Sequence, residues 1–329
     1  MAVVGAGSWG TTFASLATAN VPVLLWAREP GLAERITATH ENPDYLAGHA
    51  LHPELRATES LPVAAEQADV VVMAVPTHAF RKVLAGLAPH VRPWIPVVSL
   101  SKGFEEHTRK RMTEVIAEEL PGHPAGVLSG PTLAKEVLAG LAAAAVIAMP
   151  DLSVAQRLQD LVRTSRFRVY TATDVIGVEV GGAVKNVVAI AAGIADGLGT
   201  GDNTRALVIS RGVAEMTRLG VAMGGSPATF AGLTGLGDAI ATSISPLSRN
   251  RTLGLQVAQG KTVEEITQGT RMVMEGVRAA GAACCLAEKL GVDAPIIREI
   301  SAVVNEGRTP QEALEGLSRV APAREDEAG

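Results

Sequence analysis

The sequence predicts an α/β fold in which a doubly wound sheet is followed by an all-helical domain. Apolar strands alternate with helices up to about residue 172, and beyond that point only helical patterns are strong. A glycine-rich turn also joins the first strand to the first helix. We therefore expect a Rossmann domain at residues 1–172 and a helical domain at 173–329, with a flexible tail at about 321–329.

The glycine-rich turn is the strongest local signal in the first domain. Ala2–Val4 has the pattern of a buried strand, Gly5, Gly7 and Gly10 form a G-x-G-x-x-G turn, and Thr11–Ala19 continues as a helix. Such glycines allow a tight turn, a close approach of backbone to a pyrophosphate, and close helix packing. A chain with 34 glycines also produces chance matches, so the alternative is a tight turn without a ligand.

The second strand bears on the choice of nucleotide. Val21–Trp26 is apolar and runs into Ala27, Arg28 and Glu29. An acidic residue at the end of this strand favours NAD through the ribose 2′-hydroxyl, whereas Arg28 could bind the 2′-phosphate of NADP. The sequence therefore leaves NAD and NADP both open, with an ordinary surface arginine as the alternative.

The remaining elements of the first domain follow from apolar runs and breakers. Further strands are expected at 69–75, 95–100, up to 129, 146–149 and 167–170, and helices at 31–39, from 77, at 133–138 and at 153–164. Lys102 directly follows the strand at 95–100. Because ligands bind at the carboxyl ends of parallel strands, we interpret Lys102 as an anion-binding residue rather than a surface lysine.

The helical half contains one basic residue in unusual surroundings. Helices are expected at 174–198, 204–219, 226–230, 247–259, 262–267, 275–290, 295–305 and 310–317. Lys185 is the only basic residue between Tyr170 and Thr204. A lysine in such an apolar helix must be paired, be titrated down or point into a cleft, and a pKa lowered by desolvation suits proton exchange. The alternative is a lysine that reaches the surface.

Two later clusters complete the candidate site. Asp238 follows three closely spaced glycines, and Thr242, four residues further on, shares its helical face. Ser248–Arg251 offers a hydroxyl, two guanidinium groups and an amide in consecutive positions, which suits a phosphate. Glu275 begins a predicted helix. The alternatives are a helix cap for Asp238, a solvated basic turn for Ser248–Arg251, and an N-terminal acid for Glu275.

Composition excludes several classes of protein. A net charge of −5 gives no electrostatic footprint for nucleic acid. The adjacent Cys284 and Cys285 are interpreted as buried small hydrophobes in a reducing compartment. No signal-peptide pattern opens the chain, and the apolar run 137–149 is shorter than the ~20 residues that a membrane helix needs. We expect a cytoplasmic protein without a membrane or metal site, and the apolar helical half is compatible with a homodimer.

Together these motifs resemble the bacterial type of NAD(P)-dependent glycerol-3-phosphate dehydrogenase. The shared motifs are Gly-Ala-Gly-Ser-Trp-Gly, Ser-Lys-Gly, Ser-Gly-Pro-Thr, Gly-Gly-Ala-Val-Lys-Asn, Gly-Leu-Gly-Asp and Ser-Arg-Asn-Arg, in this order over nearly the whole chain. The resemblance implies interconversion of sn-glycerol 3-phosphate and dihydroxyacetone phosphate by hydride transfer with NAD or NADP, in support of glycerophospholipid synthesis.

The resemblance also implies a role for each matching residue. Lys185 and Asp238 are the expected catalytic residues, with Lys185 exchanging the proton and Asp238 holding its ammonium group. The expected cofactor contacts are Gly5, Gly7, Ser8, Trp9, Gly10, Arg28, Lys102, Ala134, Arg249, Val273 and Glu275. The expected substrate contacts are Lys102, Gly130, Thr132, Lys185, Asp238, Thr242, Ser248, Arg249 and Asn250.

Two other functions remain to be distinguished from this one. A dehydrogenase for a hydroxy acid or ketopantoate could share the Rossmann unit and a helical lysine, but the Ser248–Arg251 cluster favours a phosphorylated triose. A catalytically idle NAD(P) sensor is expected to lack the lysine or the phosphate anchor, and this sequence has both.

Overall fold

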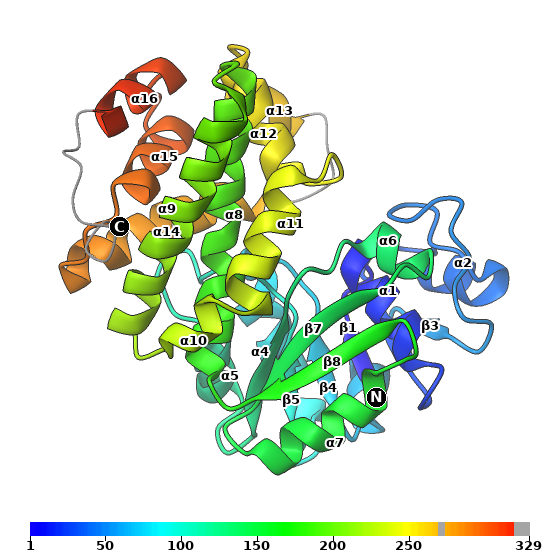
Figure 1. Ribbon diagram of the computed structural model, residues 1–329. Coiled ribbons are helices and arrows are strands. Elements are labelled where there is room, and N and C mark those ends of the chain that lie inside the picture. The colour runs from blue at the N-terminus through cyan, green and yellow to red at the C-terminus, as the bar shows by residue number, and fades with distance from the viewer. Residues whose placement is uncertain (269–273, 319–329) are drawn as a thin grey trace. The chain divides into compact units, whose positions relative to one another are not determined.

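The computed structural model describes residues 1–268 and 274–318, so the expected tail at 321–329 lies outside the described residues. The chain forms two compact units (Figure 1). The first comprises Met1–Ser101 and Lys110–Val175, and the second comprises Lys102–Arg109 and the chain from Ile176 onward. The polypeptide therefore passes from one unit to the other after Ser101, after Arg109 and after Val175.

The first unit is built on an eight-stranded sheet with the order β3-β2-β1-β4-β5-β6-β7-β8. Its strands are β1 (Ala2–Val4), β2 (Leu24–Trp26), β3 (Arg56–Thr58), β4 (Val71–Met73), β5 (Val97–Ser99), β6 (Ala125–Ser129), β7 (Ala143–Ala148) and β8 (Phe167–Ala172). Neighbouring strands are parallel except for β6 and β7. The predicted α/β architecture, with a Rossmann-like domain before a helical one, is confirmed.

The antiparallel pair has a local cause. Between β6 and β7 the chain contains only the five-residue helix α6 (Ala134–Leu138). A parallel connection usually contains a full crossover helix that packs on the face of the sheet. The chain therefore returns beside β6 in the opposite direction, and Leu128 pairs with Ile147.

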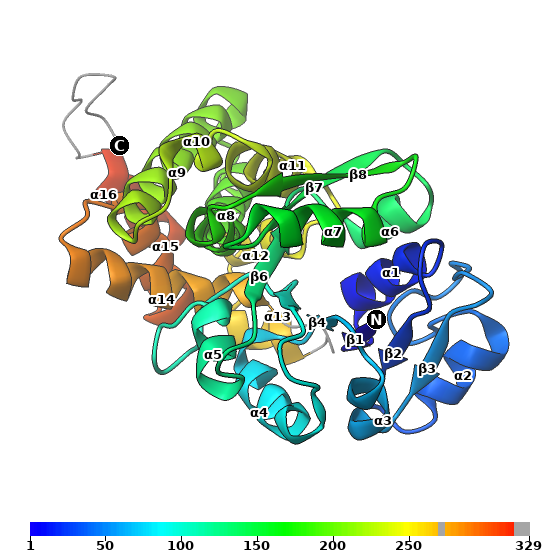
Figure 2. The same ribbon diagram turned by 90° about the horizontal axis from the view of Figure 1, so that it is seen from below.

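Helices cover both faces of this sheet (Figure 2). One face packs against α1 (Ser8–Ala17), α2 (Leu32–Thr39), α6 and α7 (Leu152–Val162). The other face packs against α3 (Leu61–Glu66), α4 (Thr77–Leu87) and α5 (Met112–Glu119), and the 3₁₀ turn η1 (Ala88–His90) follows α4. Because both faces are covered, the central strands are apolar throughout rather than alternating.

The observed strands are shorter than the apolar runs that predicted them. The second strand begins at Leu24 rather than Val21, because Pro22 has no N–H to contribute to a ladder. Similarly, β4 covers only Val71–Met73 within the apolar run at 69–75. The short edge strand β3 and the helix α5 were not predicted, since neither has a long apolar pattern.

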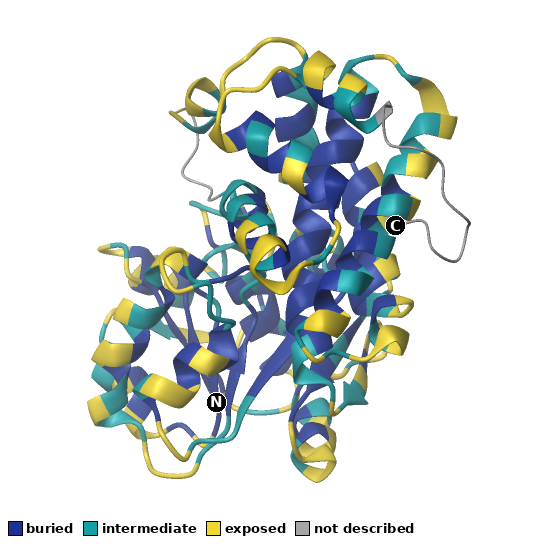
Figure 3. Ribbon diagram, turned by 90° about the vertical axis from the view of Figure 1, so that its left-hand side faces the viewer, coloured by how far each residue is buried: buried dark blue, intermediate teal, exposed yellow. Residues whose placement is uncertain are grey.

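The second unit is helical and is organised around one long helix. Its helices are α8 (Val175–Gly197), α9 (Gly201–Ala222), α10 (Pro227–Phe230), α11 (Asp238–Ile244), α12 (Arg249–Ala258), α13 (Val263–Gln268), α14 (Glu275–Leu290), α15 (Pro295–Asn305) and α16 (Pro310–Ser318), and a π-helical turn η2 (Leu233–Gly237) precedes α11. Every residue of α8 from Gly177 to Ala195 is buried. Figure 3 shows the buried residues, in dark blue, on the inner helices and strands of each unit. The apolar side chains of α8 thus pack in the core of the protein.

By length and composition alone, α8 could also cross a bilayer, and it is the one described helix with that property. Its most apolar 18-residue window is 89% buried within the protein. The buried core helix of a folded domain has this composition as well.

The cysteines differ from expectation. Cys284 is half-buried and Cys285 is exposed on α14, so the prediction of two buried side chains is wrong. The core side of α14 is occupied by alanines, among them Ala279, Ala283 and Ala287. The two cysteines follow the buried pair Ala282 and Ala283, so Cys284 lies at the edge of the buried face of α14 and Cys285 lies beyond it.

Candidate active site

The glycine turn of the first unit has the shape of a nucleotide cradle. Gly5 has a φ of +120°, and a Cβ on it would lie 2.6 Å from the carbonyl oxygen of Ala74. A Cβ on Gly10 would lie 2.0 Å from the carbonyl oxygen of Gly5. In contrast, nothing lies within 4 Å of a Cβ built on Gly7. The turn is therefore closed on the side of the sheet and open at its middle glycine, where a ligand could approach the backbone.

The N-terminus of α1 adds electrostatic attraction for an anion. Gly7 is the N-cap residue, and no side chain caps the helix. Uncapped N–H groups at a helix N-terminus bind phosphate well. The indole Nε1 of Trp9 is buried and has no hydrogen-bond partner in the described part of the chain. The open turn, the uncapped helix and this orphaned donor all fit a dinucleotide.

The other residues expected at the nucleotide have their own contacts in this unit. The Ser8 hydroxyl donates to the carbonyl oxygen of Tyr45 at 3.2 Å. The Arg28 side chain is 72% exposed and pairs with the Glu29 carboxylate at 3.0 Å. The carbonyl oxygen of Ala134 accepts a bond from the Thr12 hydroxyl at 3.4 Å, which joins α6 to α1.

Gly130 and Thr132 follow strand β6 in the same unit. Gly130 has a φ of +139°, a conformation that favours glycine. The Thr132 hydroxyl donates to the carbonyl oxygen of Gly130 at 3.1 Å. Both residues thus belong to one sharp turn at the carboxyl end of a strand.

The second unit brings four predicted residues together in a buried cluster. Lys102 Nζ lies 2.6 Å from Asp238 Oδ2, and Lys185 Nζ lies 3.1 Å from Asp238 Oδ1. The Lys185 ammonium also donates to the Thr242 hydroxyl at 2.7 Å, and that hydroxyl donates to Asp238 Oδ1 at 3.0 Å. Asp238 is 2% exposed and Lys185 is 7% exposed. One carboxylate therefore holds two ammonium groups.

Burial and charge shift the pKa values of this cluster. Desolvation lowers the pKa of Lys185 to about 8, although the Asp238 carboxylate opposes this shift and Lys102 adds to it. Burial alone would raise the pKa of Asp238, but Lys102 and Lys185 outweigh it and hold that pKa below its ordinary value. At neutral pH the cluster thus contains a carboxylate and a lysine ready to give up a proton.

Local sequence explains how the cluster is assembled. Lys185 is on α8, and Gly181 lies one turn earlier on the same helix. A Cβ on Gly181 would lie 2.9 Å from the carbonyl oxygen of Thr234 in the η2 turn. This close approach places the start of α11, and with it Asp238, beside Lys185.

The N-terminus of α12 is tied to α8 by side-chain amides. The Ser248 hydroxyl caps α12 by accepting from the N–H of Arg251 at 3.2 Å. Asn250 Nδ2 donates to Asn186 Oδ1 at 2.8 Å, and Asn186 Nδ2 donates to the carbonyl oxygen of Lys102 at 3.3 Å. The Asn250 Oδ1 atom is buried without a partner among the residues described, so it is an orphaned acceptor beside the cluster.

The two arginines of the Ser248–Arg251 motif differ. Arg251 Nε and Nη2 both bond to Asp196 Oδ2, at 2.9 and 2.7 Å, so this guanidinium serves the helical scaffold. Arg249 is the first residue of α12, is exposed, and interacts electrostatically with Glu275 at the start of α14. Val273, the remaining predicted cofactor contact, lies outside the described residues.

Three side chains that hydrogen-bond to predicted site residues or to the glycine turn were missed from sequence: Asn186, Asp196 and Asn42. Asn186 adjoins Lys185, so its position next to the motif lysine was an available signal. Asp196 is the first acidic residue after Glu179 on the apolar helix α8, so its isolation could also have been noticed in the sequence. Asn42 lies in a loop-rich segment without a periodic pattern, and only the structure reveals its contacts.

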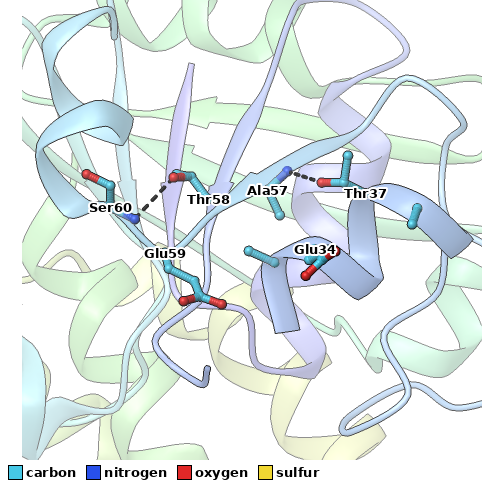
Figure 4. A pocket seen from close by; sticks show the side chains of 8 residues that line it. Glu34, Thr37, Ala57, Thr58, Glu59 and Ser60 are labelled. Atoms are coloured by element: carbon cyan, nitrogen blue, oxygen red, sulfur yellow. Dashed lines mark hydrogen bonds between the residues drawn. The ribbon is translucent and has the colours of Figure 1, made fainter. Parts of the chain in front are cut away.

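A separate hollow of about 650 Å³ lies between α2 and β3 (Figure 4). Its polar groups bond to one another, for example Ala57 N–H to Thr37 Oγ1 at 3.0 Å and Ser60 N–H to Thr58 Oγ1 at 3.1 Å. Its lining contains none of the predicted site residues. Among residues 1–268 and 274–318, no group of three or more His, Cys, Asp or Glu side chains is placed to hold a metal ion.

A dinucleotide cradle and a buried lysine–aspartate cluster within one chain define a nicotinamide-dependent dehydrogenase. Comparisons with known proteins agree. The family description of the NAD-dependent glycerol-3-phosphate dehydrogenase N-terminus matches residues 1–155, and that of the C-terminus matches residues 174–315. The chain belongs to the NAD-dependent glycerol-3-phosphate dehydrogenase family.

Individual relatives give the same result. A glycerol-3-phosphate dehydrogenase [NAD(P)+] of Mycobacterium avium is 53% identical over 98% of this chain and 95% of its own. One from Sphingopyxis alaskensis is 52% identical over 96% of this chain and 95% of its own. The crystal structure of the Coxiella burnetii glycerol-3-phosphate dehydrogenase is 35% identical, with a TM-score of 0.92 over 97% of this chain and 98% of that one. The predicted family, enzyme class and NAD or NADP cofactor are confirmed.

Proposed function

We propose that this enzyme interconverts sn-glycerol 3-phosphate and dihydroxyacetone phosphate, with Lys185 as the residue that gives and takes the proton. The observation that carries this assignment is the buried Lys185 ammonium, whose pKa is about 8 and which Asp238 and Thr242 hold in place. When bound, the nicotinamide supplies or accepts the hydride at C2 of the substrate. The chain's own residues supply the proton and the binding energy.

In the direction of reduction, negative charge develops on the oxygen at C2. The positive charge of Lys185 stabilises that oxygen, and its Nζ then transfers a proton to it. Asp238 keeps the ammonium charged and oriented until this transfer. In the opposite direction, neutral Lys185 takes the proton from the hydroxyl group. Thr242 bridges Lys185 and Asp238, so Lys185 Nζ keeps one position in both directions.

Binding of the phosphate group orients the substrate. Arg249, Asn250 and Lys102 are the proposed anchors, since a guanidinium, an amide and an ammonium can together bind a dianion. Binding energy at the phosphate then fixes C2 for reaction. The full proposed set of substrate contacts is Lys102, Gly130, Thr132, Lys185, Asp238, Thr242, Ser248, Arg249 and Asn250.

For the cofactor, the Gly5–Gly10 turn and the N-terminus of α1 are the proposed pyrophosphate site. The cradle shape of Gly5 and Gly10, the openness at Gly7 and the orphaned Trp9 donor support this. Further proposed contacts are Ser8, Arg28, Lys102, Ala134, Arg249, Val273 and Glu275. Residues 1–172 are proposed as the cofactor domain and residues 173–329 as the substrate domain, except that Lys102–Arg109 belongs to the helical unit.

The cellular setting is a further part of the proposal. Glycerol 3-phosphate is the backbone of glycerophospholipids, so a role in their synthesis is consistent with the family. A net charge of −5 argues against binding to nucleic acid. We propose a cytoplasmic enzyme that acts without a membrane, and an assembly as a homodimer.

The test is an absorbance assay of dihydroxyacetone phosphate reduction, run separately with NADH and NADPH. The wild-type enzyme is expected to oxidise at least one of them, and Lys185→Ala is expected to lower kcat by about 10²–10⁴-fold. Lys289→Ala, on an exposed part of α14, is the control and should leave kcat unchanged. Near-wild-type turnover by Lys185→Ala contradicts the assignment. Reduction of ketopantoate but not of the phosphorylated ketone contradicts the substrate.

A further inference from the structure

The buried side chain of Asn42 lies against the glycine turn. Asn42 is in the loop after α2, and it is 0% exposed. Its Nδ2 donates to the carbonyl oxygen of Ala6 at 2.9 Å and to the Thr11 hydroxyl at 2.8 Å. Its Oδ1 accepts from the N–H of Tyr45 at 3.2 Å. All of these residues belong to the first unit.

The two bonds of Asn42 Nδ2 reach the glycine turn and the helix α1, which together form the proposed pyrophosphate site. Ala6 lies between Gly5 and Gly7, so the first bond fixes the peptide at the centre of the turn. Thr11 lies in the first turn and a half of α1, so the second bond fixes the helix whose N-terminus faces the proposed pyrophosphate. We propose that Asn42 is a positioning residue for cofactor binding, which holds the turn and the helix in their binding geometry. This inference rests on the proposed function of the turn.

The chemistry of the site requires an amide. The Ala6 carbonyl and the Thr11 hydroxyl need donors, and the Tyr45 N–H needs an acceptor. An asparagine side chain supplies two N–H groups and a carbonyl oxygen within one planar group. A carboxylate in the same place has no donor, and an alanine leaves buried polar groups unpaired, which is unfavourable.

The loop that carries Asn42 is itself held firmly. The Ser8 hydroxyl donates to the carbonyl oxygen of Tyr45 at 3.2 Å, and the Ser15 hydroxyl accepts from the N–H of His52 at 2.8 Å. A β-bridge between Glu41 and Ala50 closes the base of the loop. The loop is therefore held in place by its own hydrogen bonds, and Asn42 connects it to the glycine turn.

The first test compares Asn42→Ala with the wild-type enzyme by fluorescence titration with NADH and with NADPH. Loss of one net buried hydrogen bond to the turn is expected to raise both dissociation constants by about tenfold, since ~1.4 kcal/mol is a factor of ten. The ratio of the two constants should stay within twofold, because the turn binds the pyrophosphate that both cofactors share. At saturating cofactor, kcat and the KM for dihydroxyacetone phosphate should also stay within about twofold of wild type.

Asn20→Ala is the matched control. Asn20 Nδ2 likewise donates two bonds, to the carbonyl oxygens of Leu161 and Arg163 beyond the far end of α1, although Asn20 is exposed and Asn42 is buried. This variant removes two amide hydrogen bonds away from the turn and should leave both cofactor dissociation constants unchanged. Equal weakening by Asn20→Ala and Asn42→Ala would show a general structural effect and overturn the proposal.

Substitutions at Thr11 test the same bond from its other side and cover the case that Asn42→Ala does not fold. Thr11→Val removes the hydroxyl with little change of shape and should weaken both cofactors, whereas Thr11→Ser keeps the hydroxyl and should restore wild-type affinity. Unchanged cofactor binding in a folded Asn42→Ala variant and in Thr11→Val overturns the role of Asn42. If the wild-type enzyme itself binds neither NADH nor NADPH, the proposed function of the turn fails instead.

Discussion

At the scale of single residues, the ammonium group of Lys185 is held by Asp238 and Thr242 at a place where water competes little. Two opposing effects act on it, because burial disfavours its charge and the Asp238 carboxylate favours it. The balance leaves a proton that can be donated near neutral pH. A surface lysine, with a pKa near 10.4, would hold its proton too tightly to exchange it in both directions.

The rate should therefore depend on pH in opposite ways for the two directions. Lys185 must be protonated for reduction, so kcat/KM for dihydroxyacetone phosphate should fall as pH rises through about 8. Oxidation of sn-glycerol 3-phosphate needs the neutral amine, so its kcat/KM should rise over the same range. Initial rates from pH about 6.5 to 9.5 measure this. Profiles with the same slope in both directions contradict the role of Lys185.

Arg249 is the arginine of the Ser248–Arg251 motif that is expected to bind the substrate phosphate, since Arg251 is paired with Asp196. Arg249→Ala should raise the KM for the phosphorylated substrate by at least about tenfold, because a hydrogen bond to a charged group contributes about 1.5–3 kcal/mol. Arg168→Ala, on an exposed position of β8, is the control. Steady-state kinetics at saturating cofactor distinguish the variants, and an unchanged KM for Arg249→Ala would remove it from the phosphate site.

At the scale of elements, several helix ends are secured by side chains from elsewhere in the same unit. The fully buried Glu215 on α9 accepts the N–H groups of Ile296 at 2.8 Å and Ile297 at 2.9 Å, in the first turn of α15. Burial raises the pKa of Glu215 to about 7, although these two bonds oppose that shift. A carboxylate suits this position because each of its oxygens accepts one N–H group.

Glu215→Gln should lower the free energy of unfolding by about 1–3 kcal/mol, because one side-chain oxygen becomes an NH₂ group that faces a backbone N–H. Chemical denaturation at about pH 8, where Glu215 is ionised, measures the difference. Glu264→Gln on α13 is an exposed control. Equal stability of Glu215→Gln and wild type would show that the cap contributes little.

Sequence patterns predict these elements unevenly. Long periodic runs such as α8, α14 and α15 are visible from apolar spacing, and the glycine turn is visible from its steric demands. Short elements such as β3 are not, because three residues carry no period. Lys185 stands out as a charge in an apolar helix. The bonds of Asn42 and Asp196 depend on contacts between distant segments, so no local pattern specifies them.

At the scale of the whole molecule, cofactor binding should raise the thermal stability of the protein. NADPH at about 100 times its dissociation constant adds roughly 2.7 kcal/mol to the native state, which is expected to raise the thermal midpoint by roughly 5 °C. Adenosine at the same concentration lacks the pyrophosphate and should give a smaller rise. Thermal scanning measures both, and an unchanged midpoint with NADPH contradicts binding of the dinucleotide.

The segment Lys102–Arg109 limits how this protein can be divided. It belongs with the helical unit, where the Phe104 side chain is 2% exposed in the core and Glu106 pairs with Arg278. A fragment that starts at residue 173 therefore lacks Lys102, one of the two cations on Asp238, and the complementary fragment exposes Phe104. Recombination at a single junction cannot exchange either half intact, so a chimaera must transfer residues 102–109 together with the helical unit.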